Sequence, residues 1–257
     1  MTKIYIYLDK SVEQNASTYF EKAKKAKKKL VGAKEALEKT KKKLGALRKE
    51  KEVITEKKEV KKKPKKEWFE KFRWFYSSDN FLVIGGRDAT TNEIIIKKHT
   101  DKDDLVFHTD IAGSPFGVIK AEKKKIPKKT IEETAEFTAT FSRAWKLGIP
   151  FTEVYYILPG QVSKKAKAGE YLKKGAFMIY GKKNYLSPKI NLAIGLYKGK
   201  IMSGPVSAVK KHCKDFFIIE QGDEKSSSIA KEINKKFNVE LDDVIRALPP
   251  GSCRIKG

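Results

Sequence analysis

The chain has 257 residues and a strong excess of positive charge, which narrows the kinds of partner that it can bind. It contains 57 Lys and Arg against 32 Asp and Glu, so the formal net charge is +25 at pH 7. A protein this basic is attracted to polyanions, chiefly nucleic acids and anionic membrane surfaces. The sequence has no apolar run of about 20 residues, no lipidation signal and no secretory leader pattern. A cytoplasmic protein without a membrane partner is therefore expected.

Residues 1–66 are predicted to form a basic coiled-coil arm. They hold 23 basic and 9 acidic residues, which is more than half of the net charge. Ser11 and Gln14 have the spacing of a helix capping box, and Pro64 is expected to end the helical region. Apolar and small side chains recur at alternating steps of four and three, the heptad pattern of a coiled coil, at Tyr19, Ala23, Ala26, Leu30, Ala33, Leu37, Thr40, Leu44, Leu47 and, one position late, Ile54.

The apolar seam of this arm is too narrow to be buried by one helix, so it needs a partner. A return helix after Gly45, a second copy of the chain in a homodimer, and a segment outside this sequence are all open as that partner. Like charges four residues apart, such as Lys24 and Lys28, cost helix stability unless counter-charge is supplied from outside. A phosphate backbone would supply it, whereas a solvated coiled-coil face is the simpler interpretation.

Residues 67–257 are predicted to form one α+β domain, with a mixed or antiparallel sheet and flanking helices. Asp79-Asn80 and Lys198-Gly199 are expected to be tight turns between strands. Short apolar runs predict strands near residues 73–77, 81–85, 104–109, 115–120, 153–158, 176–181, 191–197 and 216–220. Periodic apolar positions predict helices at 90–98, 128–146, 205–212, 226–236 and 241–247.

Aromatic residues crowd the start of this domain. Five of them are expected to lie in the core rather than on a binding surface: Trp68, Phe69, Phe72, Trp74 and Phe75. Alternation along the strand places Arg73 and Tyr76 on the other face, where they are expected to be exposed. The helix at 128–146 is expected to cross the same core, with Pro127 before it and Gly148 after it.

A diglycine segment, Gly85-Gly86-Arg87-Asp88, joins an apolar strand to the predicted helix at 90–98. With Asp88 or Thr90 as the N-cap, backbone N–H groups and the Arg87 side chain can point at a phosphate. The alternative is a glycine turn with a capped helix, because diglycine turns are common and the segment is not a P-loop. The candidate nucleic-acid contacts in this region are Arg87, Asp88, Asn92, Lys97 and Lys98.

His108 ends an apolar strand and is followed by Asp110 and Ser114. An imidazole at this position can stack on a base or donate to a phosphate, so His108 and Ser114 are candidate RNA contacts. A His-x-Asp pair can instead ligate a metal. With only His99, His108 and His212 in the chain and no cysteine nearby, such a site would need scattered carboxylates. The structural alternative is a buried His108 that hydrogen bonds to Asp110.

Two lysine clusters flank the predicted strand at 176–181. Lysine beside tyrosine suits a surface that binds nucleic acid. The alternative is a solvated strand edge, where lysine also discourages sheet-to-sheet aggregation. The candidate contacts here are Lys164, Lys165, Lys182 and Lys183, with Tyr180 and Tyr185 beside them.

Four blocks of the chain resemble a known family in order and spacing. They read WFEKFRWFYSSDNFLVIGGRDATTNEIIIKKH, DLVFHTDIAGSPFGVIKA, GEYLKKGAFMIYGKKNYL and GPVSAVK. They are similar to the C-terminal R domain of the NFACT proteins, which are ribosome-associated quality-control factors, in a form that resembles the archaeal one. The earlier DKSVEQNASTYFEKAKKAKKKLVGAKEAL resembles the start of that family's coiled-coil middle region, so the resemblance covers essentially the whole chain.

The resemblance implies a role in ribosome quality control. It implies binding to tRNA and to the RNA of obstructed large ribosomal subunits, in support of template-free C-terminal tailing of stalled nascent chains. Full-length members carry an N-terminal NFACT domain and a helix-hairpin-helix segment before the coiled coil. Neither is found in this sequence, which is therefore expected to be a fragment or a split-gene product.

An RNA-binding module rather than an enzyme is the predicted function. The sequence shows no Ser/His/Asp triad, HExxH motif, zinc-ligand spacing or Walker pattern, so no cofactor is expected. Cys213 and Cys253 are too few and too far apart for a disulfide framework, and both are expected to be reduced. The alternatives are a metal-dependent nuclease acting through His108 and Asp110, and a coiled-coil scaffold or DNA-binding protein that dimerises through the heptads.

Overall fold

The computed structural model describes residues 4–56, 66–165, 172 and 174–256, with residues 46–56 described by their backbone alone. The chain divides into two units, Met1–Lys65 and Lys66–Gly257. The first unit contains a single described helix, and the second contains all the described strands. No described helix combines the length and the apolar character that a transmembrane span requires.

The arm is one helix, α1 (Val12–Glu56), and its start follows the predicted capping box. The backbone N–H of Ser11 donates to Oε1 of Gln14 at 3.0 Å, and the backbone N–H of Gln14 donates to Oγ of Ser11 at 3.3 Å. The helix continues without a break through Gly45, so the predicted option of a return helix after Gly45 is wrong. Pro64 lies outside the described residues.

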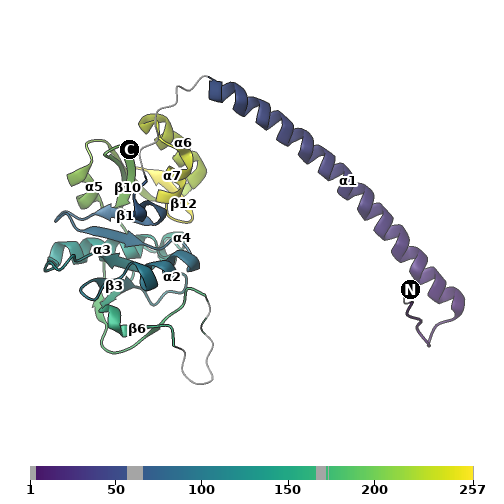
Figure 1. Cartoon of the computed structure of the whole chain (residues 1–257), viewed down its shortest axis with the longest axis horizontal. Coiled ribbons are helices and arrows are strands. Elements are labelled where there is room, and N and C mark those ends of the chain that lie inside the picture. Colours follow the sequence, from purple (N-terminus) through teal and green to yellow (C-terminus); the bar gives the residue numbers. More distant parts are fainter. Residues whose placement is uncertain (1–3, 57–65, 166–171, 173, 257) are drawn as a thin grey trace. The chain divides into compact units, whose positions relative to one another are not determined.

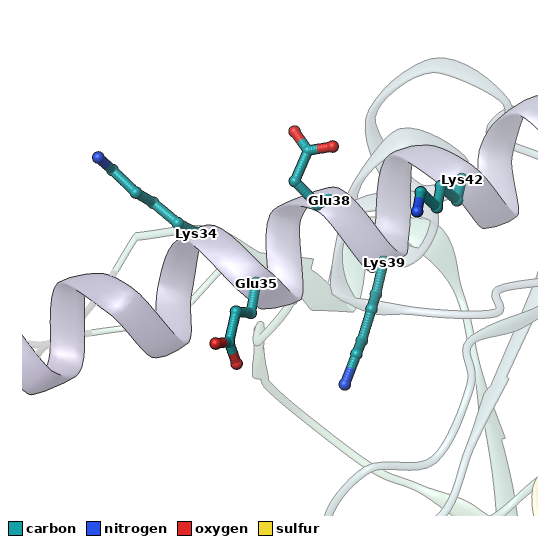
Figure 2. A pocket seen from close by; sticks show the side chains of 5 residues that line it. All are labelled: Lys34, Glu35, Glu38, Lys39 and Lys42. Carbon is teal, nitrogen blue, oxygen red and sulfur yellow. The ribbon is translucent and has the colours of Figure 1, made fainter.

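The apolar seam of α1 is exposed within its own unit. Tyr19, Leu30, Leu37 and Leu44 keep between 38% and 56% of their surface accessible. Side chains of both charges lie in the middle of the helix. They line a shallow hollow and are Lys34, Glu35, Glu38, Lys39 and Lys42 (Figure 2). Opposite charges four residues apart support a helix, in contrast to the all-lysine stretch that precedes them.

The folded unit contains two larger antiparallel sheets (Figure 1). The six-stranded sheet has the order β1-β2-β4-β3-β5-β8, and the four-stranded sheet has the order β10-β9-β11-β12. The first comprises β1 (Arg73–Tyr76), β2 (Leu82–Gly85), β3 (Leu105–His108), β4 (Gly117–Ile119), β5 (Val154–Ile157) and β8 (Asn184–Leu186). The second comprises β9 (Leu192–Tyr197), β10 (Lys200–Gly204), β11 (Phe216–Lys225) and β12 (Ser252–Ile255). A separate pair is formed by β6 (Val162–Ser163) and β7 (Met178–Ile179).

Helices flank both sheets, so the predicted α+β fold is confirmed. α6 contacts β11 and β12, α7 contacts β10, and the two helices pack on each other (Figure 1). The helices are α2 (Ala89–Lys98), α3 (Lys128–Thr140), α4 (Arg143–Lys146), α5 (Val206–His212), α6 (Ser226–Phe237) and α7 (Leu241–Ala247), with 3-10 turns at Trp68–Lys71 and Pro159–Gln161.

The six-stranded sheet is covered differently on its two faces. Phe137 of α3 contacts Phe75 of β1, with ring centroids 5.0 Å apart, so α3 packs on the face that carries Phe75. Gly117 lies between Phe107 and Thr138 of α3, which places Phe107 on the α3 face as well. Because side chains alternate along a strand, His108 points to the opposite face.

Two turns form as predicted, and one predicted helix does not. Lys198 and Gly199 have φ angles of 49° and 78°, as a two-residue hairpin turn between β9 and β10 requires. Asn80, in the turn between β1 and β2, has a φ of 64°. The predicted helix at 128–146 is interrupted after Phe141. Oγ of Ser142 accepts from the backbone N–H of Ala144 at 3.1 Å and starts α4 as a new helix.

The aromatic cluster at the start of the unit is buried with one exception. Phe69, Phe72, Trp74 and Phe75 are all buried, as predicted. Trp68 is 43% exposed, so its predicted place in the core is wrong. Its indole instead stacks on the ring of His99 at 4.6 Å, on the outside of the unit. Cys213 and Cys253 are buried and free, and burial raises the pKa of both thiols.

Candidate nucleic-acid interface

The N-terminus of α2 is capped by the chain itself. Oδ1 of Asp88 accepts from the backbone N–H of Thr91 at 2.8 Å, and this hydrogen bond holds the pKa of Asp88 below its ordinary value. Oγ1 of Thr91 accepts in turn from the backbone N–H groups of Arg87 and Asp88, at 2.8 and 2.9 Å. A phosphate approaching the backbone here would meet the Asp88 carboxylate. The Arg87 side chain is therefore the anion-binding group that this turn offers.

Two of the predicted contact residues, Asn92 and Ser114, are buried and form internal hydrogen bonds. Oδ1 of Asn92 accepts from the backbone N–H of Phe116 at 3.1 Å, and its amide donates to the Ser114 carbonyl at 3.5 Å. The Ser114 hydroxyl donates to the Ile111 carbonyl at 2.8 Å. Both side chains hold the loop before β4 against α2, and neither presents its polar atoms to solvent.

Glu93 connects α2 to the segment that carries the first lysine cluster. It pairs with Lys97 at 2.6 Å, accepts from the backbone N–H of Gly175 at 3.4 Å and lies 3.9 Å from Nζ of Lys164. Nζ of Lys164 donates to the Ala176 carbonyl at 3.0 Å. Gly175 packs closely against the start of α2, because a Cβ on Gly175 would lie 2.6 Å from the Ala89 side chain. A shallow hollow along α2 is lined by Thr90, Glu93, Ile94, Lys97, Lys98 and Lys174.

His108 lies in a row of rings that come from the loop before β4 and from the adjacent strands β3, β5 and β8. Its imidazole stacks on Phe116 at 4.1 Å and meets the edge of Tyr155 at 6.2 Å. Tyr155 in turn lies 5.7 Å from Tyr185 on the edge strand β8. Nδ1 of His108 is 2.9 Å from the Pro115 carbonyl, to which it donates, so Nε2 is left as an acceptor. The structural alternative named Asp110 as the hydrogen-bond partner of His108, but the partner of Nδ1 is the Pro115 carbonyl.

Burial lowers the pKa of His108. The pH dependence of the free energy of unfolding therefore tests whether the neutral side chain is buried as described. A group whose pKa is depressed by folding contributes stability that is present above the unfolded-state pKa and is lost as the pH falls. For His108 the loss is expected below the ordinary value of 6.5. The stability lost between about pH 7.5 and 5.5 should be smaller in His108→Gln than in the parent chain. Urea unfolding at each pH measures this difference, and equal losses in both proteins would contradict it.

Lys183 lies over the exposed end of the ring row. Its Nζ pairs with Oδ1 of Asp110 at 2.8 Å and lies 4.2 Å from the Tyr155 ring centroid. The Tyr185 hydroxyl donates to Oδ2 of Asp110 at 3.2 Å, so both carboxylate oxygens are engaged. The neighbouring Lys182 is exposed. The turn that presents both lysines is held by Gln161, whose amide donates to the carbonyls of Tyr180 and Lys182 at 2.7 and 3.0 Å.

The ring row links the two lysine clusters through packed side chains, of which Phe116 and Tyr155 are buried. Phe116 contacts Phe177 at 5.4 Å, and Nζ of Lys164 lies 5.0 Å from the Phe177 ring. The path from Lys164 to Lys183 therefore runs through packed rings without a break. Lys165, next to Lys164, is exposed. We call the lysines at the two ends of this row, those of α2 that Glu93 links to them, and His108 the lysine face; its members from the predicted set are Lys97, Lys98, His108, Lys164, Lys165, Lys182 and Lys183.

The sequence did not predict several residues that shape this surface. Three of them are Glu93, which pairs with Lys97, Gln161, which holds the turn that carries Lys182, and Tyr155, whose ring lies under Lys183. No local sequence motif indicates these contacts. Arg73 was expected to be exposed, but its Nε is enclosed and its side chain lies near Arg87. Within the described residues, no group of three or more His, Cys, Asp or Glu side chains is placed to hold a metal ion.

Residues 71–181 match the family model described as the NFACT protein RNA binding domain. The match includes the diglycine turn, α2, the His108 strand and the first lysine cluster. The chain belongs to the NFACT family. All of the predicted contact residues except Lys182 and Lys183 fall inside the matched NFACT segment.

Two curated relatives of this NFACT chain are ribosome quality control proteins by name. The Archaeal Rqc2 homolog aRqcH of Methanocaldococcus jannaschii is 44% identical over 207 residues, which are 77% of this chain and 31% of the relative. The human Ribosome quality control complex subunit NEMF is 40% identical over 179 residues, which are 68% of this chain and 16% of the relative. The chain thus spans about a third or less of the length of these relatives.

A solved structure also matches this NFACT chain. It is the C-terminal part of the fibronectin/fibrinogen-binding protein from Streptococcus suis, with a TM-score of 0.40 and 20% sequence identity. The match covers 70% of this chain and 77% of the solved chain.

Proposed function

We propose that this chain is the RNA-binding module of a cytoplasmic ribosome quality-control factor, with residues 1–66 as its basic arm and residues 67–257 as its RNA-binding domain. Its proposed partners are tRNA and the RNA of obstructed large ribosomal subunits, and its proposed role is to support C-terminal tailing of stalled nascent chains. The observation that carries the proposal is the family match over residues 71–181, which contains most of the lysine face. The proposed role is one of binding and not of catalysis.

The charges of the lysine face support this proposal. Lys98, Lys165 and Lys182 are exposed, so they can reach phosphates without first breaking a buried contact. Phosphate contacts of this kind give affinity without sequence preference. The rings add a second element, because Tyr180 and Tyr185 are 42% and 50% exposed and can stack on unpaired bases. Single-stranded or bent RNA offers such bases, whereas a regular DNA duplex does not.

The arm is proposed as a second cationic surface. Its exposed seam needs a helical partner, which is a second copy of the chain or another segment of a longer protein. Either pairing would bury the seam and leave the lysines of α1 outward, where they can reach RNA phosphates.

The proposal predicts selective and salt-dependent binding to tRNA. The affinity of the chain for tRNA and for a DNA duplex of equal charge can be measured by fluorescence anisotropy over a salt series. At physiological salt the chain should bind tRNA more tightly than the duplex. Replacing Lys98, Lys165 and Lys182 together by Gln should lower the slope of log Kd against log salt by about 2 to 3, at roughly 0.7 to 0.9 per lost phosphate contact. The matched control replaces three exposed lysines of α5 and α6, Lys210, Lys231 and Lys235, by Gln.

The outcomes separate the alternative functions. Equal binding to tRNA and duplex DNA, with no difference between the two triple variants, would mean that net charge alone acts and would contradict the proposal. Cleavage of the tRNA that stops when EDTA is added would favour the metal-dependent nuclease. A salt-insensitive dimer without affinity for tRNA would favour the scaffold.

A further inference from the structure

Two arginine side chains beside α2 have buried nitrogen atoms without a partner. Within the described residues, the Nε atoms of Arg73 and Arg87 are both enclosed and make no hydrogen bond. A buried donor without an acceptor is destabilising, so folded proteins rarely keep one without a reason. Two such donors at neighbouring positions indicate an arrangement that an outside group completes.

Arg73 is held in place from both sides. It begins β1 opposite Gly85, its Nη1 donates to the Gly86 carbonyl at 2.9 Å, and its Cζ lies 4.5 Å from the Phe141 ring centroid. Gly86 directly precedes Arg87, so the Arg73 side chain reaches from β1 to the turn that carries Arg87. This placement keeps a positive charge behind Arg87 with little freedom to move away.

The charges around this turn are not balanced. Burial, and next the charge of Arg87, lowers the pKa of Arg73 to about 10. Burial, and next the charge of Arg246 on α7, lowers the pKa of Arg87. Among the described residues neither Arg73 nor Arg87 forms an ion pair with a carboxylate. Asp88 is committed to the backbone of Thr91, and Arg246 pairs with Asp243 at 3.8 Å, so Arg73 and Arg87 have only one neighbouring carboxylate and it is already engaged.

We propose that a phosphate group binds Arg87 at this turn, with Arg73 behind it as a fixed positive charge. A guanidinium presents its donors as a planar fork that matches two oxygens of a phosphate, which a lysine ammonium does not. Arg87 is the movable member, because its side chain is only partly buried whereas Arg73 is fixed by Gly86 and Phe141. Turning Arg87 toward the anion gives its enclosed Nε an acceptor.

The source of the phosphate follows from the proposed function, on which this step rests. The turn lies at the start of α2, and α2 carries Lys97 and Lys98 of the lysine face. A phosphodiester of an RNA strand that lies along α2 is the occupant that we infer. A free phosphate ion has the same chemistry, so the experiment must separate the two sources.

The test follows the Nε–H signals of the arginines of the full chain in ¹H–¹⁵N spectra. Inorganic phosphate is added at constant ionic strength with chloride, and a short single-stranded RNA is added in a second series. The Arg73 and Arg87 signals should shift and saturate in both. The signal of Arg254 should stay in place, because its Nε already donates to Glu220 at 3.3 Å. Arg87→Lys, which keeps the charge but loses the fork, should weaken phosphate binding about tenfold.

Each outcome decides one part of the proposal. Saturable shifts with phosphate, combined with RNA affinity that Arg87→Gln does not change, would leave an anion site but overturn RNA as its occupant. Absence of any shift at Arg73 and Arg87 while tRNA still binds would overturn the site and leave the proposed function standing. If the parent chain itself does not bind tRNA, the proposed function is refuted. Lys125→Gln, on an exposed loop, controls for the removal of one charge.

Discussion

Replacing Lys120 by Met is expected to lower the free energy of unfolding by about 3–5 kcal/mol, because it leaves a buried carboxylate without its counter-charge. Lys120 is only 9% exposed and Asp104 only 1%. The ammonium group pairs with Asp104, pairs with Asp101 at 2.7 Å and donates to the His99 carbonyl at 3.1 Å. After the substitution, Asp104 keeps only the backbone N–H groups of Asp101 and Ala121 as donors. Urea unfolding followed by tryptophan fluorescence measures the change.

The controls separate the buried pair from the exposed one. Asp101 shares the same lysine, but its side chain is 82% exposed, so Asp101→Asn should cost no more than about 1 kcal/mol. Lys102→Met changes an exposed lysine of the same loop and should have little effect. Adding Asp104→Asn to Lys120→Met should recover part of the loss, because it removes the unpaired charge. A loss below about 1 kcal/mol in Lys120→Met would show that the pair contributes little.

The elements that could be predicted from the sequence are those with a strong local signal. α1 follows from a heptad pattern and a capping box, both of which depend on residues close in the chain. The β9–β10 hairpin follows from Lys198-Gly199, where glycine readily adopts the positive φ that the turn needs. In each case the side chains that decide the structure lie within a few residues of each other.

The strands that were not predicted lie where the local pattern is weak. β8 is an edge strand of three residues, two of which are exposed, so its sequence has no apolar alternation to detect. β10 was predicted only as the strand that follows the Lys198-Gly199 turn, without a range, and β12 was missed; each pairs with only one neighbour in the second sheet. The break after Phe141 depends on Ser142, whose hydroxyl also donates to the Ala139 carbonyl at 2.6 Å. Its sequence signal is a single serine within an otherwise helical pattern.

The candidate surface was predicted in its charges but not in its geometry. The lysines could be identified because they form clusters in the sequence, but Lys164 and Lys183 are connected only through rings that come from two strands and two loops. Arg73 was misplaced because it was assigned to the face opposite Phe75, whereas alternation puts residues 73 and 75 on the same face, where Phe137 and Phe141 cover them. The strand is covered on both faces, by α3 at Phe75 and by Tyr197 of the second sheet at Trp74. Only the tertiary structure reveals that second cover.

Replacing Gly86 by Ala is expected to disrupt the start of α2 and to weaken tRNA binding as well. A Cβ at Gly86 would overlap Oδ1 of Asn92 and would lie 3.2 Å from the Asn92 backbone nitrogen. The Asn92 side chain would have to leave, and the backbone N–H of Phe116 would lose its acceptor. Overpacking costs about 1–3 kcal/mol and an unpaired buried donor about the same again, so a loss of roughly 2–6 kcal/mol is expected.

The functional part of this prediction depends on Gly86 as an acceptor. Its carbonyl holds Arg73, so displacing the turn moves Arg73 and Arg87 away from the arrangement proposed for phosphate. Gly160→Ala is the matched control, because nothing lies within 4 Å of a Cβ placed there. That variant should keep both its stability and its affinity for tRNA. If Gly86→Ala unfolds at the same urea concentration as Gly160→Ala, the close contact with Asn92 is not a constraint on the fold. If it is destabilised yet binds tRNA with unchanged affinity while folded, the turn stabilises α2 but makes no contribution to RNA binding.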